Sequence, residues 1–103
     1  DMSTLHTVNK SPFERDSLSS CIRLATKGCA ILLIEDGVFG AMAGTDHSDM
    51  VKAAMDKASV YVLGPDLAAR GMSEDRVIDG IQVVDYSGFV DLTKQHETCQ
   101  SWL

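Results

Sequence analysis

Cysteine is sparse in this sequence, and its spacing does not suggest a metal site or a disulfide framework. Three cysteines, an odd number, occur in 103 residues, at positions 21, 29 and 99. No two of them have the C-x-x-C spacing of a zinc or redox motif. Such usage is typical of a reducing compartment in which thiols remain free, so we expect a cytoplasmic protein.

Positive charge is scarce as well. The chain has 9 lysines and arginines against 15 acidic residues, which gives a net charge of −6. A surface that binds nucleic acid or an anionic membrane needs clustered basic side chains, whereas these are scattered. We therefore expect no direct contact with nucleic acid or membrane, and a protein or small molecule as the partner.

Long apolar runs and phosphate-binding loops are also missing. No apolar stretch approaches the about 18 residues that a membrane span needs, and DMSTLHTVNK lacks the apolar segment of a secretory signal. Asp1 precedes Met2, which we interpret as the natural start. The glycines of GVFGAMAG match neither nucleotide-binding fingerprint, so we expect no cofactor and no metal. Composition and length predict one domain over residues 1–103.

What is present is an alternation of short apolar runs with helical patterns. It predicts an α/β fold in which a mainly parallel sheet of about four to five strands lies between two helix layers. The run CAILLI is continuously apolar, as in a strand that is covered on both faces. The strands are expected near residues 4–8, 30–34, 60–63 and 81–85.

Capping signals predict where the helices begin. Ser11 and Glu14 have the spacing of a capping box around Pro12, so the first helix is expected to run from there to Gly28. Later helices are expected after Thr45 or Asp46, between Pro65 and Gly71, and after Ser87. The apolar stripe of the first helix contains Phe13, Leu18, Cys21, Ile22, Leu24 and Ala25.

Polar residues follow the expected strands, at the edge where parallel sheets bind ligands. They are Asn9, Lys10, Glu35, Asp36, Gly64, Asp66, Asp85 and Tyr86. A metal-dependent phosphoacceptor site would also need a third carboxylate and a lysine in register, which Asp85 and Lys94 do not provide convincingly. We interpret the acidic residues as helix caps and turn residues. His6, His47 and His96 are far apart and are interpreted as packed side chains.

The local pattern favours packing for two of the three cysteines. Cys29 opens an apolar strand and is expected to be buried. Cys21 lies in the apolar stripe in the middle of its helix, where the helix dipole lowers a thiol pKa little. Cys99 lies in a polar tail and is expected to be the most exposed.

Several stretches together resemble the DsrH/TusB family of small sulfur-relay proteins. They are LHTVNKSPF, LLIEDGV, YVLGPDLAARG, VVDYSGFVDLT and the terminal Trp102, in the same order and with close spacing. The resemblance implies a YchN/DsrE-like α/β/α domain that forms one subunit of a DsrEFH or TusBCD heterohexamer. DsrE/TusD-like and DsrF/TusC-like chains would be its partners, and the DsrE/TusD-like chain would carry the main sulfur-carrying cysteine. Sulfur would pass along persulfides to a DsrC/TusE-like acceptor.

The resemblance also gives Cys21 a candidate role. DsrH-type members carry a cysteine on the first helix, which the better-known TusB-type members lack, so Cys21 is a candidate persulfide carrier. Its thiol would then be at least partly open to solvent or to a groove. This favours DsrH-type sulfur oxidation over TusB-type 2-thiolation of a tRNA wobble uridine. A purely structural subunit and a stand-alone ligand-binding module remain alternatives.

Overall fold

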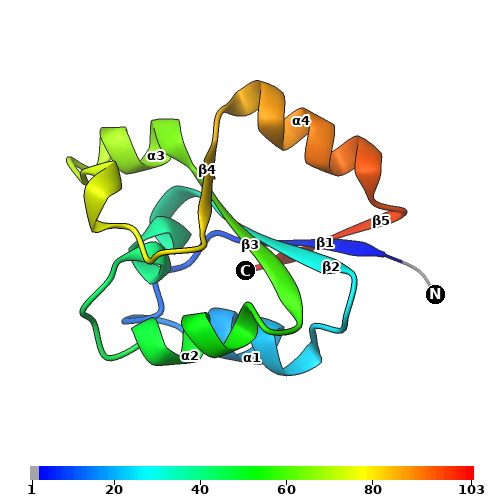
Figure 1. Ribbon diagram of the computed structural model, residues 1–103, viewed down its shortest axis with the longest axis horizontal. Helices are drawn as coiled ribbons and strands as arrows, with labels where there is room; N and C mark the ends of the chain where they lie inside the picture. Colours follow the sequence, from blue (N-terminus) through cyan, green and yellow to red (C-terminus); the bar gives the residue numbers. More distant parts are fainter. Residues whose placement is uncertain (1–2) are drawn as a thin grey trace.

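A computed structural model describes residues 3–103; Asp1 and Met2, and with them our interpretation of the start, lie outside the described residues. Five strands form one sheet in the order β4-β3-β2-β1-β5, and every neighbouring pair is parallel (Figure 1). The predicted α/β class with a parallel sheet is therefore confirmed. The strands are β1 Thr4–Val8, β2 Cys29–Leu33, β3 Ala58–Leu63, β4 Gln82–Val84 and β5 Thr98–Trp102.

Helices cover both faces of this sheet. Helices α1 (Ser17–Leu24) and α2 (Ser48–Ala54) lie on one face, and α4 (Tyr86–Gln95) lies on the other (Figure 1). The 3₁₀ helix η1 (Glu35–Ala41) follows β2, and α3 (Gly64–Ala69) follows β3. A short 3₁₀ turn, η2 (Glu74–Arg76), follows α3. Within residues 3–103, no helix has the length and apolarity to cross a membrane.

The sequence of β2 explains its central place. All five of its residues are buried, and it pairs with β1 on one side and with β3 on the other. Alternate side chains point to opposite faces of a strand. Ile31 and Leu33 therefore belong to the core under α1 and α2, while Ala30 and Leu32 belong to the smaller core under α4.

The first helix begins later than the capping box predicts. Residues 11–15 form a turn, in which the Ser11 carbonyl accepts hydrogen bonds from the backbone N–H groups of Glu14 and Arg15. The Ser11 hydroxyl accepts from the N–H of Phe13 at 3.2 Å and does not cap the helix. As a result, α1 starts at Ser17, and Phe13 lies outside it, 57% exposed.

The apolar stripe of α1 is correspondingly narrower than predicted. Leu18, Cys21 and Ala25 are buried against the sheet, whereas Leu24 is 66% exposed. The later caps differ as well. Asp85, not Ser87, caps α4, because its Oδ1 accepts from the Gly88 N–H at 2.8 Å. His47, not Thr45 or Asp46, occupies the N-cap of α2.

The strand β5 is a feature that the sequence pattern did not predict. Its residues are mostly polar and exposed, so it lacks the alternation of a half-buried strand. It pairs with β1 in a parallel ladder from Thr4↔Thr98 to Val8↔Trp102, and side-chain contacts support this pairing. The Trp102 indole N–H donates to His6 Nδ1 at 3.0 Å, and the Thr4 and Thr98 hydroxyls lie 2.8 Å apart.

Leu18→Ala and Leu24→Ala form a matched pair on α1. Leu18→Ala should lower the free energy of unfolding by about 2–5 kcal/mol, because it leaves a cavity in the core. Leu24→Ala should change it by less than about 0.5 kcal/mol, because the side chain is already exposed. Urea denaturation measures both, and equal losses would contradict the position of α1.

Stability should also depend on pH through His6. Burial lowers the pKa of His6 below 6.5, and its Nδ1 must be unprotonated to accept from Trp102. Because the folded-state pKa is lowered, the stabilisation that neutral His6 gives the fold is complete above pH 6.5. It is lost as the pH falls through the folded-state pKa. Between about pH 7.5 and about pH 5, His6→Asn should therefore lose less stability than the unmodified chain. Equal losses in urea titrations would show that His6 is not the titrating group.

Candidate functional site

The acidic residues at the carboxyl edge of the sheet are occupied by structural contacts. Asp66 Oδ2 accepts a hydrogen bond from the Glu35 N–H at 2.7 Å. The backbone of Glu35 is left-handed there, with a φ of 50°. Asp36 Oδ1 pairs with Arg70 Nε at 3.0 Å. The interpretation as caps and turn residues is thus confirmed for Asp66 and Asp85, whereas Asp36 forms an ion pair. Among residues 3–103, no three His, Cys, Asp or Glu side chains are grouped to hold a metal ion.

Two further features lie at this edge. Asn9 Oδ1 is buried and has no hydrogen-bond partner among the described residues. A cavity of about 430 Å³ lies where α3 and α4 begin. Its lining residues are Gly64, Glu74, Val83, Val84, Asp85 and Gly88. Neither feature brings a nucleophile and a base together.

Each histidine contacts a different part of the molecule, as the packing interpretation predicts. His6 accepts from Trp102, and the His47 ring packs edge-on against Phe13 with centroids 4.8 Å apart. His96 Nδ1 lies 2.7 Å from the Leu92 carbonyl, to which it donates. The three rings therefore do not form a shared site.

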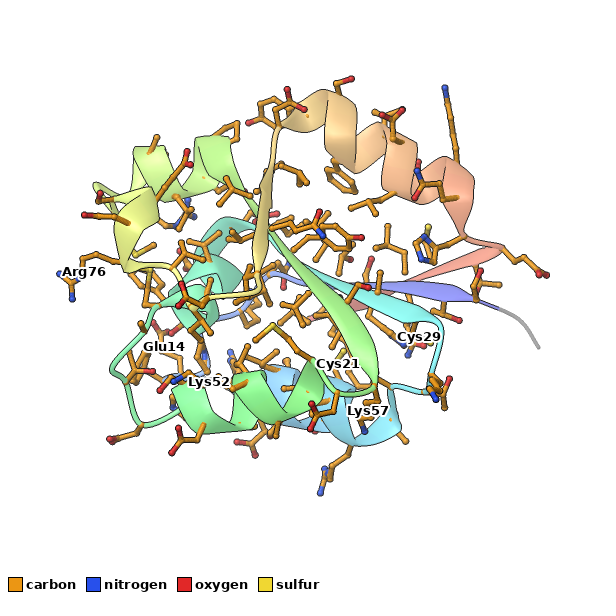
Figure 2. The ribbon with its side chains drawn as sticks, in the orientation of Figure 1. Glu14, Cys21, Cys29, Lys52, Lys57 and Arg76 are labelled. Carbon is orange, nitrogen blue, oxygen red and sulfur yellow. The ribbon has the colours of Figure 1, made fainter. Side chains whose placement is uncertain are left out.

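Cys21 lies in the centre of the core between α1 and the sheet (Figure 2). Its exposed fraction is 0%, so the expectation of a partly open thiol is wrong for the chain by itself. Burial raises the pKa of the thiol to about 12, with a smaller raising effect from the charge of Cys29 and an opposing one from Lys57. At about pH 8 the Cys21 thiol is therefore almost entirely protonated, whereas the thiolate is the reactive form.

Cys29 is buried at the start of β2, as predicted, but its environment differs from that of Cys21. Burial raises the pKa of its thiol, yet hydrogen bonds from the Thr26 hydroxyl and from the backbone of Thr26 and Thr4 lower it below the ordinary value overall. The Thr26 Oγ1 atom lies 3.3 Å from Cys29 Sγ. Cys99 is exposed, which confirms the third cysteine prediction.

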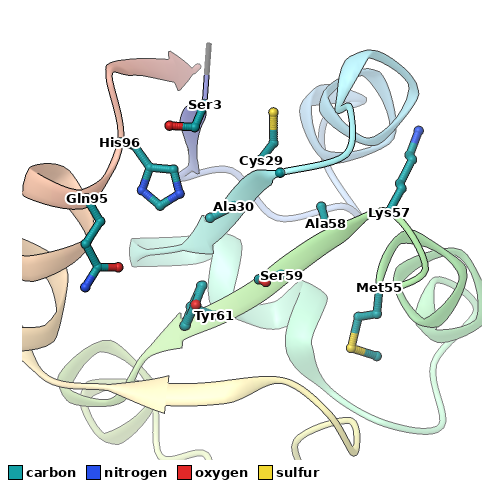
Figure 3. Close-up of a pocket in the computed structure, with 11 residues that line it drawn as sticks. Ser3, Cys29, Ala30, Met55, Lys57, Ala58, Ser59, Tyr61, Gln95 and His96 are labelled. Carbon is teal, nitrogen blue, oxygen red and sulfur yellow. The ribbon is translucent and has the colours of Figure 1, made fainter. Parts of the chain in front are cut away.

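A cavity of about 380 Å³ opens at the amino edge of the sheet, beside Cys29 (Figure 3). Its lining residues include Ser3, Cys29, Lys57, Ser59, Tyr61 and His96. Sequence reasoning missed this site because it considered only the carboxyl ends of the strands. The signal that was available is Lys57, a charged residue immediately before β3.

Comparison with known proteins gives a consistent assignment. The family described as DsrH like protein matches residues 10–99. A protein named Protein TusB from Pectobacterium parmentieri is 38% identical over 100 residues, which cover 95% of this chain and 99% of that protein. Protein TusB from Escherichia coli O1:K1 / APEC is 37% identical over 98 residues, with the same coverage.

Solved structures support the fold. The ychN protein from E. coli superimposes with a TM-score of 0.80, over 98% of this chain and 99% of that chain. The two sequences are 16% identical, so this likeness concerns the fold alone. The expected YchN-like architecture is confirmed.

The burial of Cys21 predicts slow labelling by thiol reagents. In a Cys29→Ser/Cys99→Ser variant, Cys21 should stay unmodified at about pH 8 until guanidinium unfolds the chain, because the thiol is both covered and protonated. A Cys21→Ala/Cys29→Ser variant, which retains Cys99, should label at once under the same conditions. Rapid labelling of Cys21 in the folded chain would contradict its closed position.

Proposed function

The chain belongs to the DsrH/TusB family, and on that basis we propose that it is a subunit of a cytoplasmic sulfur-relay complex that delivers persulfide sulfur to a DsrC/TusE-like acceptor. The observation that carries this proposal is similarity to proteins named Protein TusB over 95% of the chain. DsrE/TusD-like and DsrF/TusC-like chains are the proposed partners, in a heterohexamer. The acidic net charge of −6 fits a subunit that contacts proteins and not RNA.

The surface of α4 supports a role in assembly. Tyr86 and Val90 are 60% and 50% exposed and lie one helical turn apart, so they form an apolar strip on the outside of the helix. Contiguous exposed apolar side chains are typical of surfaces that bind another protein. We assign this strip to contact with the partner subunits.

Two physiological roles are consistent with the family. A cysteine on α1, Cys21, favours the DsrH-type role in sulfur oxidation, whereas the name of the relatives favours the TusB-type role in 2-thiolation of the wobble uridine of tRNA. The name rests on similarity along the whole chain and the cysteine on one position, so the TusB-type role has the stronger support. Deleting the gene should then remove 2-thiouridine from tRNA, and unchanged tRNA with impaired sulfur oxidation would favour the other role.

To act as a persulfide carrier, Cys21 needs a conformation in which α1 no longer covers its thiol. Helix α1 would have to separate from the sheet to expose a thiol that is now 0% exposed. Separation exposes Leu18 as well and therefore costs several kcal/mol of burial free energy. While α1 covers Cys21, this subunit contributes a binding surface for its partners. Sulfur transfer by the complex then depends on thiols other than Cys21.

The complex itself provides the test. Co-expression with DsrE/TusD-like and DsrF/TusC-like chains should give one species containing all three, measured by native mass spectrometry. Val90→Ser should weaken the species, because it removes apolar area from α4. Leu24→Ser, which removes an even more exposed apolar side chain from α1, should leave it intact. A chain that remains monomeric with every partner would favour the stand-alone module.

A further inference from the structure

The cavity at the amino edge of the sheet has its floor on the face that α4 covers. Ala30 and Ser59 are paired across β2 and β3, and both side chains are small. Val60 belongs to the core under α1 and α2, so Ser59, its neighbour on β3, points to the opposite face. The next pair on that face, Leu32 and Tyr61, is larger and packs under α4. The cavity of about 380 Å³ is the space that the smaller pair leaves unfilled.

The end of α4 places polar groups beside this floor. Gln95 and His96 line the cavity from the helix side (Figure 3). The Leu92 carbonyl oxygen can only accept, so His96 Nδ1 donates to it at 2.7 Å. In the neutral imidazole, Nε2 then keeps a lone pair that can accept a hydrogen bond from a hydroxyl group. Ser59, which is exposed, offers a hydroxyl of its own. Together they provide a donor and an acceptor for one polar group of a ligand.

The charge of the lining is positive, although the chain as a whole has a net charge of −6. Within residues 3–103, no aspartate or glutamate lines this cavity, whereas Lys57 does. Lys57 is half-buried, and no carboxylate of the described chain forms an ion pair with it. Taking an unpaired ammonium group partly out of water is unfavourable, and a bound anion would offset that cost. The lining therefore favours an anion.

We propose that this cavity binds a small organic anion that carries a hydroxyl group, with its oxyanion at Lys57 and its hydroxyl between Ser59 and His96. The volume of about 380 Å³ falls in the range of small-molecule pockets. Lys57 and His96 stand on opposite sides of the cavity (Figure 3), which favours a ligand longer than an inorganic ion.

This inference goes beyond the proposed sulfur-relay function, because it involves none of the thiols. Cys29 is paired with Ala58, which belongs to the core under α1 and α2, so its side chain points away from the floor of the cavity. A carboxylate and a phosphate share the chemistry that Lys57 would recognise. The experiment therefore uses one ligand of each kind.

Titration of the ¹⁵N-labelled full chain with three related compounds tests the proposal. Glycerate and glycerol 3-phosphate are hydroxylated anions, and glycerol is their uncharged counterpart. At about 10 mM, at least one of the anions should shift the amide signals of Ala30, Ser59 and His96, and glycerol should shift none of them. The anion that binds more tightly identifies the acidic group. Shifts with glycerol as large as those with the anions, or no shift at these residues with either anion, would overturn the proposal.

Two lysines form a matched pair for the charge. Lys57→Gln and Lys52→Gln each remove one positive charge, but Lys52 is exposed on α2 and does not line the cavity. Lys57→Gln should weaken binding of the anion at least about tenfold, because a charge-assisted contact is lost. Lys52→Gln should weaken it less than about twofold, since water and salt screen an exposed charge. Equal losses would mean general attraction of anions and would contradict a site at Lys57.

Ser59→Ala tests the other end of the ligand. It should weaken binding of the same anion about fivefold, because one hydrogen bond is lost. Ser101→Ala, which removes an exposed hydroxyl from β5, should leave binding unchanged. Thermal unfolding establishes that each variant is folded, and an unaltered affinity of Ser59→Ala would refute the proposed orientation.

Binding is measured on the chain alone, so it is independent of complex formation. A chain that joins the complex but binds neither anion would refute this inference and leave the proposed function standing. A chain that binds the anion but joins no complex would have the opposite meaning.

Discussion

The burial of β2 on both faces and both edges is the constraint on which the rest of the structure depends. All five of its residues are apolar and covered, and each face of the strand supplies a separate core. Because a parallel strand needs a crossover to its neighbour, the chain must place helices over both faces of the sheet. The positions of α1, α2 and α4 follow from this requirement, as Figure 1 shows.

A fully parallel sheet separates polar groups into two edges with different uses. At the carboxyl edge, the carboxylates of Asp66 and Asp85 stabilise backbone N–H groups where η1 and α4 begin. At the amino edge, the chain enters β2 and β3 from loops that carry Thr26 and Lys57, and the lining is left open as a cavity. The carboxylates of the carboxyl edge therefore stabilise the fold, whereas the amino edge leaves an open cavity with polar lining residues.

The two buried thiols show how depth and hydrogen bonding together set reactivity. Both side chains are classed as buried, at 0% and 5% exposure. Burial in the apolar core raises the pKa of Cys21 to about 12, against a smaller lowering effect of Lys57. Cys29 lies less deep in the molecule and near hydrogen-bond donors, which outweigh the raising effect of burial on its pKa. Depth of burial and the hydrogen-bond donors around each thiol therefore act together in separating the two pKa values.

The sequence by itself determined the α/β class, four of the five strands and the burial of Cys29, because apolar runs and alternating patterns are local signals. Its similarity to a known family also identified the relatives. Tertiary structure decided the features that depend on distant residues. Strand β5 pairs with β1, and Trp102 contacts His6 while Thr98 contacts Thr4, residues 96 and 94 positions apart. Likewise, the closed position of Cys21 and the cavity beside Cys29 arise only when helices pack on the sheet, which no local pattern encodes.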